Sequence, residues 1–266
     1  MWSDLFANMS NTNFFNFSFL PKYLPAFIKG FEYTLLLAVV SVALAVIPAL
    51  LLAMMRLSKN RFVRGISGAY IAVFRSTPLL VQLSIIYFGL FQFINLPRYL
   101  LFGFIAINRF VPGVVALALN SSAYVAEIFR AGILAVDKGQ TEAARSIGMT
   151  HWQSMVHVVL PQAVRNIMPS IGNEFVVNIK DSSVLNVISV NELFFMSKSA
   201  AGTYLRYFEV FFITACIYLV LTFTVTRLLR LLERRMDGKT NYIIYGSQSD
   251  SKASIVVPKE GGVPND

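Results

Sequence analysis

The sequence contains few charged residues, a single cysteine and two histidines, and each scarcity excludes a class of protein. Only 14% of the 266 residues are charged, whereas ordinary soluble domains have about 25%, so the chain lacks the charged surface that a soluble protein needs. Cys216 has no cysteine partner for an intrachain disulfide or a paired-cysteine metal site. The spacing of His151 and His157 suits neither a metal pair on one helical face nor a base beside a nucleophile, so we interpret them as ordinary loop or interface residues.

A nucleotide-binding motif is lacking as well. Gly238-Lys239-Thr240 resembles the end of a phosphate-binding loop, but that motif needs a glycine five residues before its Gly-Lys pair, and position 233 is a glutamate. No nucleophile–base or metal constellation points to an enzyme. We therefore expect no catalytic residue, metal site or cofactor in this chain, and any ATP would have to be handled by another chain.

Long uncharged runs are what the sequence does contain. Leu35 to Met55 has 21 residues without a charge, which as a helix would be about 31 Å long and would match the roughly 30 Å of a bilayer core. Three further runs are Ser76 to Pro97, Phe110 to Ala126 and Val210 to Thr226. One such run could be a buried helix of a soluble protein, but four together predict a multi-span membrane protein.

The fold class that we predict is all-α, a polytopic membrane protein with about five transmembrane helices. The spans expected are 29–56, 66–94, 110–136, 162–190 and 206–231. Glu174, Lys180 and Asp181 interrupt the fourth span, which makes it the least regular of the five. The domain boundaries that follow are an extracytoplasmic N-terminal segment at 1–26, a transmembrane domain at 27–235 with a cytoplasmic loop at about 138–161, and a polar, disordered cytoplasmic tail at 236–266.

Basic residues predict the orientation, with the N-terminus outside and the C-terminus in the cytoplasm. In that orientation thirteen lysines and arginines fall in the inner loops and tail and six in the outer segments. The inner ones are Arg56, Lys59, Arg61, Arg64, Arg130, Lys138, Arg145, Arg165, Arg227, Arg230, Arg234, Arg235 and Lys239, and the outer ones are Lys22, Lys29, Arg98, Arg109, Lys198 and Arg206. The net charge of +9 thus reflects membrane topology, and no aromatic–basic platform for nucleic acid is present.

Arg75 is an ionisable residue predicted to lie near the membrane midplane, about 16 Å along a helix from Arg64. Pro78 disfavours a helical conformation at Thr77, so we predict a local break, which membrane proteins tolerate where the backbone lines a cavity. One interpretation is that Arg75 binds a substrate carboxylate through a forked pair of hydrogen bonds. The alternative is an internal ion pair with one of three acidic residues, Glu127, Glu174 or Asp181.

The third and fourth spans carry further polar residues at membrane depth. Asn120, Tyr124 and Glu127 fall on one helical face, and Ser121 flanks that stripe. Arg130 lies within pairing reach of Glu127. Such a stripe either lines a pathway or forms hydrogen bonds between helices, and both interpretations remain open. The second polar interruption consists of Lys180, Asp181 and Ser182.

The predicted cytoplasmic loop has the sequence of a docking element. Thr141 to Ile147 is a helix candidate, and Gly148 can end it in a left-handed conformation. A second short helix is expected over Met149 to Val159, and Pro161 should restrict the turn back into the membrane. The residues that we expect to contact a partner protein are Gln140, Glu142, Ala143, Ala144, Arg145, Gly148 and Pro161.

An ordered series of motifs resembles the permease subunits of bacterial ATP-binding-cassette importers, in particular the polar amino acid branch. The motifs are Arg75-Ser-Thr-Pro-Leu-Leu-Val-Gln82, Ala123-Tyr-Val-Ala-Glu127, Lys138-Gly-Gln-Thr-Glu-Ala-Ala144 with Gly148, Leu160-Pro-Gln162 and Lys180-Asp-Ser-Ser183. The resemblance covers about residues 28 to 235. Ser76 stands where a glycine is commoner and Ser182 where a threonine is commoner.

This resemblance implies a permease of the bacterial cytoplasmic membrane that imports a polar L-amino acid by alternating access. Its partners would be a second permease subunit, identical or not, two cytoplasmic ATPase subunits that bind ATP with Mg²⁺, and an extracytoplasmic amino-acid-binding protein. The helix from Glu142 to Gly148 would couple ATP binding to pore movement. Arg75 would meet the substrate carboxylate, and Thr77, the third-span stripe and the Lys180–Ser182 break would line the path. Glutamine, arginine, histidine and cystine remain open as substrates. An ion-gradient-driven transporter or channel is the alternative, although the sequence shows no inverted repeat.

Overall fold

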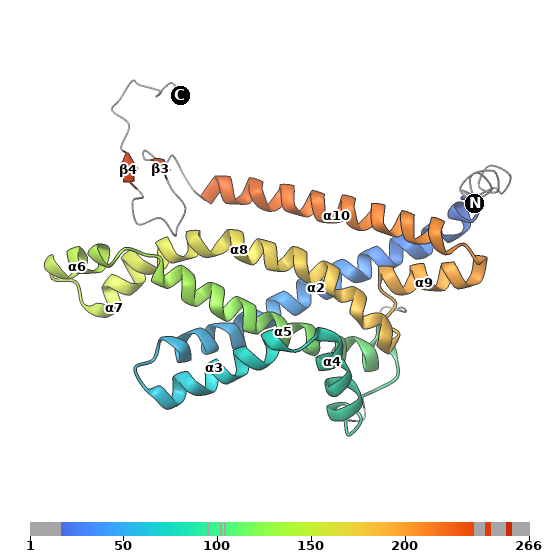
Figure 1. Cartoon of the computed structure of the whole chain (residues 1–266), viewed down its shortest axis with the longest axis horizontal. Coiled ribbons are helices and arrows are strands. Elements are labelled where there is room, and N and C mark those ends of the chain that lie inside the picture. The colour runs from blue at the N-terminus through green and yellow to red at the C-terminus, as the bar shows by residue number, and fades with distance from the viewer. Residues whose placement is uncertain are drawn as a thin grey trace, which may run out of the picture.

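The computed structural model describes residues 17–94, 96–101, 103, 105–236, 243–245 and 254–256. Its long elements are all helices (Figure 1). They are α2 (Leu20–Leu57), α3 (Arg61–Ser76), α4 (Leu79–Ser84), the π-helix η1 (Ile85–Leu90), α5 (Ile107–Leu134), α6 (Lys138–Ser146), α7 (His151–Ser154), the π-helix η2 (Met155–Val159), α8 (Leu160–Asp181), the 3-10 helix η3 (Ser182–Ile188), α9 (Leu193–Tyr204) and α10 (Tyr207–Met236). The predicted all-α class is confirmed.

Two short antiparallel strand pairs complete the described part of the chain. Strands β1 (Leu100–Leu101) and β2 (Ile105–Ala106) lie between η1 and α5, and β3 (Ile243–Tyr245) pairs with β4 (Ser254–Val256) after α10. The predicted N-terminal segment at 1–26 and the tail at 236–266 fall largely outside the described residues.

Three described helices, α2, α5 and α10, are long and apolar enough to cross a membrane, in agreement with the first, third and fifth predicted spans. The second predicted span, 66–94, contains the predicted break, and α3 and the α4–η1 helix on either side of it meet at an angle of 106°. The predicted break at Thr77 is the cause: Thr77 is extended, with φ −110° and ψ 143°, and Pro78 precedes α4. The fourth predicted span corresponds to α8 and η3, which are less apolar, so the count of five remains a prediction.

Helix α5 is the centre of the packing and lies between α2, α3 and α8 (Figure 1). Many of its buried residues are small, among them Gly113, Ala116, Ala123 and Ala126. Small side chains allow helix backbones to approach closely inside a membrane, where van der Waals packing rather than hydrophobic burial holds helices together. At Gly132 a Cβ would collide with Ile167 of α8, so only glycine permits this α5–α8 approach.

The two ends of the molecule differ. Helices α6 and α7 form one end, and α9 and the start of α2 lie at the other, with α10 running alongside α8 (Figure 1). The predicted cytoplasmic loop is thus separated from α9 by the length of the long helices.

Candidate functional site

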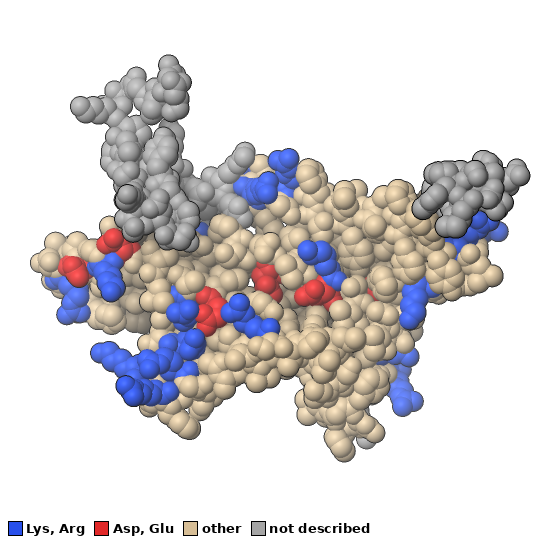
Figure 2. Space-filling model, in the orientation of Figure 1, with Lys and Arg blue, Asp and Glu red and all other residues tan. Residues whose placement is uncertain are grey.

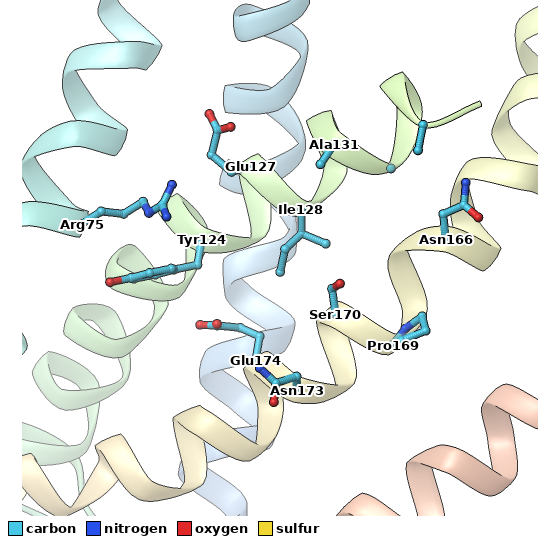
Figure 3. A pocket seen from close by; sticks show the side chains of 12 residues that line it. Arg75, Tyr124, Glu127, Ile128, Ala131, Asn166, Pro169, Ser170, Asn173 and Glu174 are labelled. Carbon is cyan, nitrogen blue, oxygen red and sulfur yellow. The ribbon is translucent and has the colours of Figure 1, made fainter. Parts of the chain in front are cut away.

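A cavity of about 690 Å³ lies between α3, α5 and α8 (Figure 3). Polar and charged side chains from all three helices face it, beside a few apolar ones. The lining residues are Arg75, Tyr124, Glu127, Ile128, Ala131, Gly132, Ala135, Asn166, Pro169, Ser170, Asn173 and Glu174. The structure therefore brings three of the predicted pathway residues, Arg75, Tyr124 and Glu127, to one site.

Arg75 stands at the end of α3, directly before the break. Its guanidinium carbon lies 5.2 Å from the centre of the Tyr124 ring, a cation–π contact. Within the described part of the chain, no carboxylate is within ion-pair distance of Arg75. Of the two interpretations open at Arg75, the internal ion pair with Glu127, Glu174 or Asp181 is not formed.

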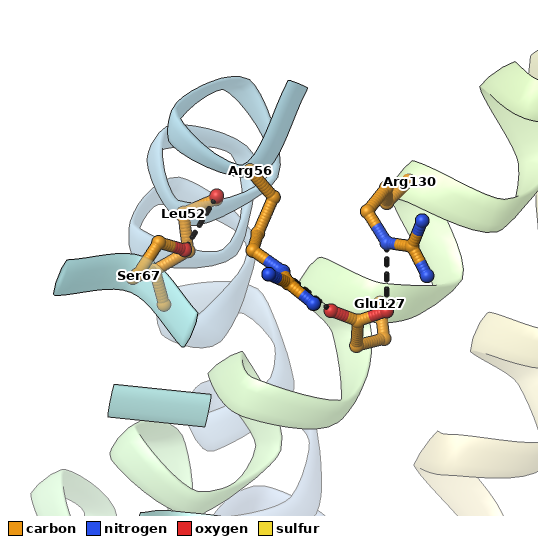
Figure 4. A network of polar contacts seen from close by, with 5 residues as sticks. All are labelled: Leu52, Arg56, Ser67, Glu127 and Arg130. Atoms are coloured by element: carbon orange, nitrogen blue, oxygen red, sulfur yellow. Dashed lines mark hydrogen bonds and ion pairs between the residues drawn. The ribbon is translucent and has the colours of Figure 1, made fainter. Parts of the chain in front are cut away.

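Glu127 is instead held by two other arginines (Figure 4). Arg56 Nε lies 3.2 Å from Oε1, and Arg130 Nε lies 2.8 Å from Oε2. The pairing with Arg130 is the predicted one. Arg56 lies in the last turn of α2. From the sequence, it contributed only to the predicted membrane orientation, because nothing in its local pattern points to a partner 71 positions away. Beside this network, Ser67 Oγ donates to the carbonyl oxygen of Leu52 at 2.8 Å and joins α3 to α2.

Gln82 holds the break between α3 and α4, a role that the sequence did not reveal. Its Nε2 donates to the carbonyl oxygens of Phe74 at 2.8 Å and Thr77 at 2.9 Å, which the break leaves without helical partners. Asn120 Nδ2 on α5 in turn donates to Gln82 Oε1 at 2.9 Å. Asn120 and Thr77, predicted in the substrate pathway, thus belong to the network that supports the bend, and neither lines the cavity.

Ser121 takes part in a second buried network. Asn178 Nδ2 on α8 donates to Ser121 Oγ, and Ser41 Oγ on α2 donates to Asn178 Oδ1 at 2.8 Å. The polar stripe of the third span therefore forms hydrogen bonds between helices with some residues and lines a cavity with others. Asn120 and Ser121 bond neighbouring helices, whereas Tyr124 and Glu127 face the cavity.

The Lys180–Ser182 break lies apart from this cavity. Lys180 lines a separate hollow of about 320 Å³ between α8 and α10, together with Arg227 and Arg230. Ser182 is buried, and its Oγ donates to the carbonyl oxygen of Ile179 at 2.8 Å. Asp181 is the last residue of α8 and is half-buried. The structure does not bring these three predicted residues together with Arg75.

Helix α8 contributes cavity residues that the sequence-based prediction missed. Asn166, Ser170 and Asn173 follow at the spacing of one helical face, and this spacing could have identified them. Glu174 was recognised as an acidic residue at membrane depth but not as part of the pathway. It is 8% exposed and makes no ion pair within the part of the chain that the structure describes.

The cytoplasmic loop folds as two short helices joined at Gly148. Helix α6 begins at Lys138, where Asp137 Oδ1 accepts a hydrogen bond from the backbone N–H of Gly139 at 2.6 Å. Gly148 has φ +89°, so the predicted left-handed stop is confirmed. Helix α7 then begins with a capping box formed by Thr150 and Gln153.

The second short helix, predicted over Met149 to Val159, does not end before Pro161, and the predicted turn is absent there. The segment α7–η2–α8 is continuous, and Pro161 lies in the first turn of α8, directly after the π-helical turn Met155–Val159. A π-turn shifts the hydrogen-bond register, so the helix can pass a residue that lacks an N–H.

The exposed surface of the loop lies on α6 and the turn that follows. The exposed predicted contacts are Gln140, Glu142, Ala143, Arg145, Gly148 and Pro161, whereas Ala144 is buried and anchors α6. Two large apolar side chains that were not predicted as contacts are also exposed, Ile147 at 80% and Trp152 at 74%.

The sequence matches a family of transport proteins and curated permeases. The family described as "Binding-protein-dependent transport system inner membrane component" matches residues 41–238. The putative glutamine transport system permease protein GlnP of Rickettsia prowazekii is 38% identical over 82% of this chain and 97% of its own length. The arginine transport system permease protein ArtQ of Bacillus subtilis is 38% identical over 84% of this chain and 98% of its own length.

A crystal structure of an amino acid ABC transporter with histidines contains a chain that is 47% identical, with a TM-score of 0.74 over 83% of this chain and 98% of that one. The methionine transporter MetNI, at 17% identity and a TM-score of 0.64, shares the fold. Because the family match covers most of the chain and the relatives align over nearly their full lengths, this chain belongs to the family of binding-protein-dependent transport system inner membrane components.

Proposed function

We propose that this chain is the pore-forming subunit of an ATP-driven importer that carries a polar L-amino acid across the bacterial cytoplasmic membrane by alternating access. The names of its relatives, which include glutamine and arginine permeases, support an amino acid as the substrate. Energy comes from ATP, which separate ATPase subunits bind with Mg²⁺, and an extracytoplasmic binding protein delivers the substrate. The predicted orientation places the N-terminus outside and the tail at 236–266 in the cytoplasm.

The cavity between α3, α5 and α8 is the observation that carries this proposal. Burying an ionisable group at membrane depth is costly, so such groups face protein or water rather than lipid. Acidic and basic side chains gather along the middle of the face that α3, α5 and α8 present in Figure 2. This face therefore belongs against a second permease subunit, with the cavity open to the pathway between the two.

The exposed side of α6 supports the docking of the ATPase. Glu142 and Arg145 offer charged groups there, and Ile147 and Trp152 offer apolar contacts close by. Gly148 lies between α6 and the continuous helix that begins at His151 and ends with α8. A displacement of α6 by the ATPase would therefore move α8, which lines the cavity.

Substitution Arg75→Ala tests the substrate pathway. The permease, its ATPase and its binding protein are reconstituted in liposomes, and uptake of a labelled polar amino acid is measured with ATP hydrolysis. Loss of a forked, charged hydrogen-bond pair costs about 1.5–3 kcal/mol, so uptake at low substrate concentration should fall roughly 10- to 100-fold while the ATPase stays bound. Arg64→Ala, at the other end of α3, is the matched control. Equal uptake by both variants and the wild type would remove Arg75 from the pathway.

A further inference from the structure

We infer that this cavity selects amino acids whose side chain is polar and uncharged, because Arg75 and Glu174 are both needed for the charges of the α-carboxylate and the α-ammonium group. The inference rests on the proposed function and names the substrate class of the same site. It follows from which charged residues of the cavity are ion-paired and which are not.

Glu127 is not available to a substrate. Both of its carboxylate oxygens accept from arginines, Arg56 at 3.2 Å and Arg130 at 2.8 Å. The three groups together carry one positive charge. This end of the cavity is therefore unfavourable for a cationic side chain, although it contains a carboxylate.

Arg75 and Glu174 are the two charged lining residues without an ion pair among the residues described. Figure 3 shows their side chains pointing into the same part of the cavity, one on α3 and the other on α8, with the Tyr124 ring beside them. The Tyr124 ring holds the guanidinium from one side and leaves its edge for a carboxylate. An amino acid zwitterion carries one group for each of these two residues.

The remaining polar wall has no charge. Asn166, Ser170 and Asn173 offer amide and hydroxyl groups along one face of α8, and Asn166 lies toward the opposite end of the cavity from Arg75 (Figure 3). Amide and hydroxyl groups bind a side chain that both donates and accepts hydrogen bonds. An apolar side chain would leave them unpaired, and sites built from such groups reject such analogues strongly. A cationic side chain would find no free carboxylate along this wall, and an anionic one would find no cationic lining residue other than Arg75, since Arg56 and Arg130 do not line the cavity.

Substrate binding to the permease has to be measured without the extracytoplasmic binding protein, because that protein has a substrate selectivity of its own. The complex of permease and ATPase, purified in detergent without nucleotide, is therefore incubated with radiolabelled L-glutamine, L-arginine, L-glutamate or L-leucine. L-Glutamine should bind at least tenfold more tightly than each of the others. Equal or tighter binding of L-arginine or L-glutamate, or binding of none of the four, would overturn the inference.

An added charge on the α8 wall gives a second test of the same inference. Asn173→Asp adds a free carboxylate to the wall and should move the preference toward L-arginine by at least tenfold, whereas Gln92→Glu makes the same chemical change at a different hollow and should move nothing. An unchanged preference in Asn173→Asp would overturn the assignment of the wall. Uptake into liposomes tests the proposed function separately. Uptake of arginine alone would contradict this inference but would still support the proposed importer function.

Discussion

The carboxylate of Glu192 is fully buried in the turn before α9, outside the membrane-capable helices. It accepts hydrogen bonds from the backbone N–H groups of Phe194 at 2.8 Å and Phe195 at 2.6 Å and from the Tyr218 hydroxyl at 3.2 Å. Burial raises the pKa of this carboxyl from 4.5 to about 7, and the hydrogen bonds oppose the rise without cancelling it. The folded protein should therefore bind a proton here that the unfolded chain releases.

The sign of the pH dependence follows from that difference. Between pH 4.5 and 7 the folded state holds more protons than the unfolded state, so the free energy of unfolding falls as the pH rises through this window and levels off above it. A difference of about 2.5 pKa units corresponds to about 3.5 kcal/mol at most, since one unit is worth about 1.4 kcal/mol. Glu192 should thus make the junction of α2, α9 and α10 more stable at pH 5 than at pH 8.

Thermal unfolding in detergent at pH 5, 6, 7 and 8 measures this contribution. Glu192→Gln keeps the shape and removes the titration, so its melting temperature should vary less with pH than that of the wild type, and the two proteins should differ most in slope between pH 5 and 7. Glu32→Gln, an exposed acidic residue of α2, is the control for a change in net charge. If Glu192→Gln and the wild type lose stability equally between pH 5 and 8, the buried carboxyl does not titrate in this window and the reasoning fails.

Three substitutions test how the cavity and the loop are supported. Gly132→Ala places a methyl group against Ile167 and should lower stability by about 1–3 kcal/mol, and adding Ile167→Ala should restore part of the melting temperature. Gln82→Leu leaves two carbonyl oxygens of the α3–α4 break without a donor, so a loss of about 1–3 kcal/mol per group is expected; a melting temperature within a degree of the wild type would contradict this. Gly148→Ala forces a left-handed conformation that costs roughly 1–2 kcal/mol and should reduce substrate-stimulated ATP hydrolysis, whereas Gly202→Ala, which meets open space at an ordinary φ, should leave it unchanged.

Local features were predictable from the sequence because they depend on neighbours along the chain. The uncharged runs identified α2, α5 and α10 because the number of residues needed to cross a bilayer is set by its thickness. Pro78 identified the break at Thr77, and Gly148 identified the end of α6, because both are constraints on single backbone torsions. The pairing of Arg130 with Glu127 followed from one turn of helix.

Tertiary structure alone decided which polar residues meet. Asn120 and Tyr124 are one helical turn apart, yet Asn120 donates a hydrogen bond to Gln82 of another helix and Tyr124 faces the cavity. The rotation of α5 relative to its neighbours determines which residue of the polar stripe does which. Arg56, 71 residues from Glu127, forms the ion pair with this carboxylate that the sequence left open for Arg75. Glu174 joins Arg75 in the cavity while Lys180, less than two turns further along the chain, faces α10. Sequence by itself determined that this chain spans a membrane and where its backbone breaks. The crossing of helices distant in sequence determined which charged residues of the cavity are ion-paired and which are not.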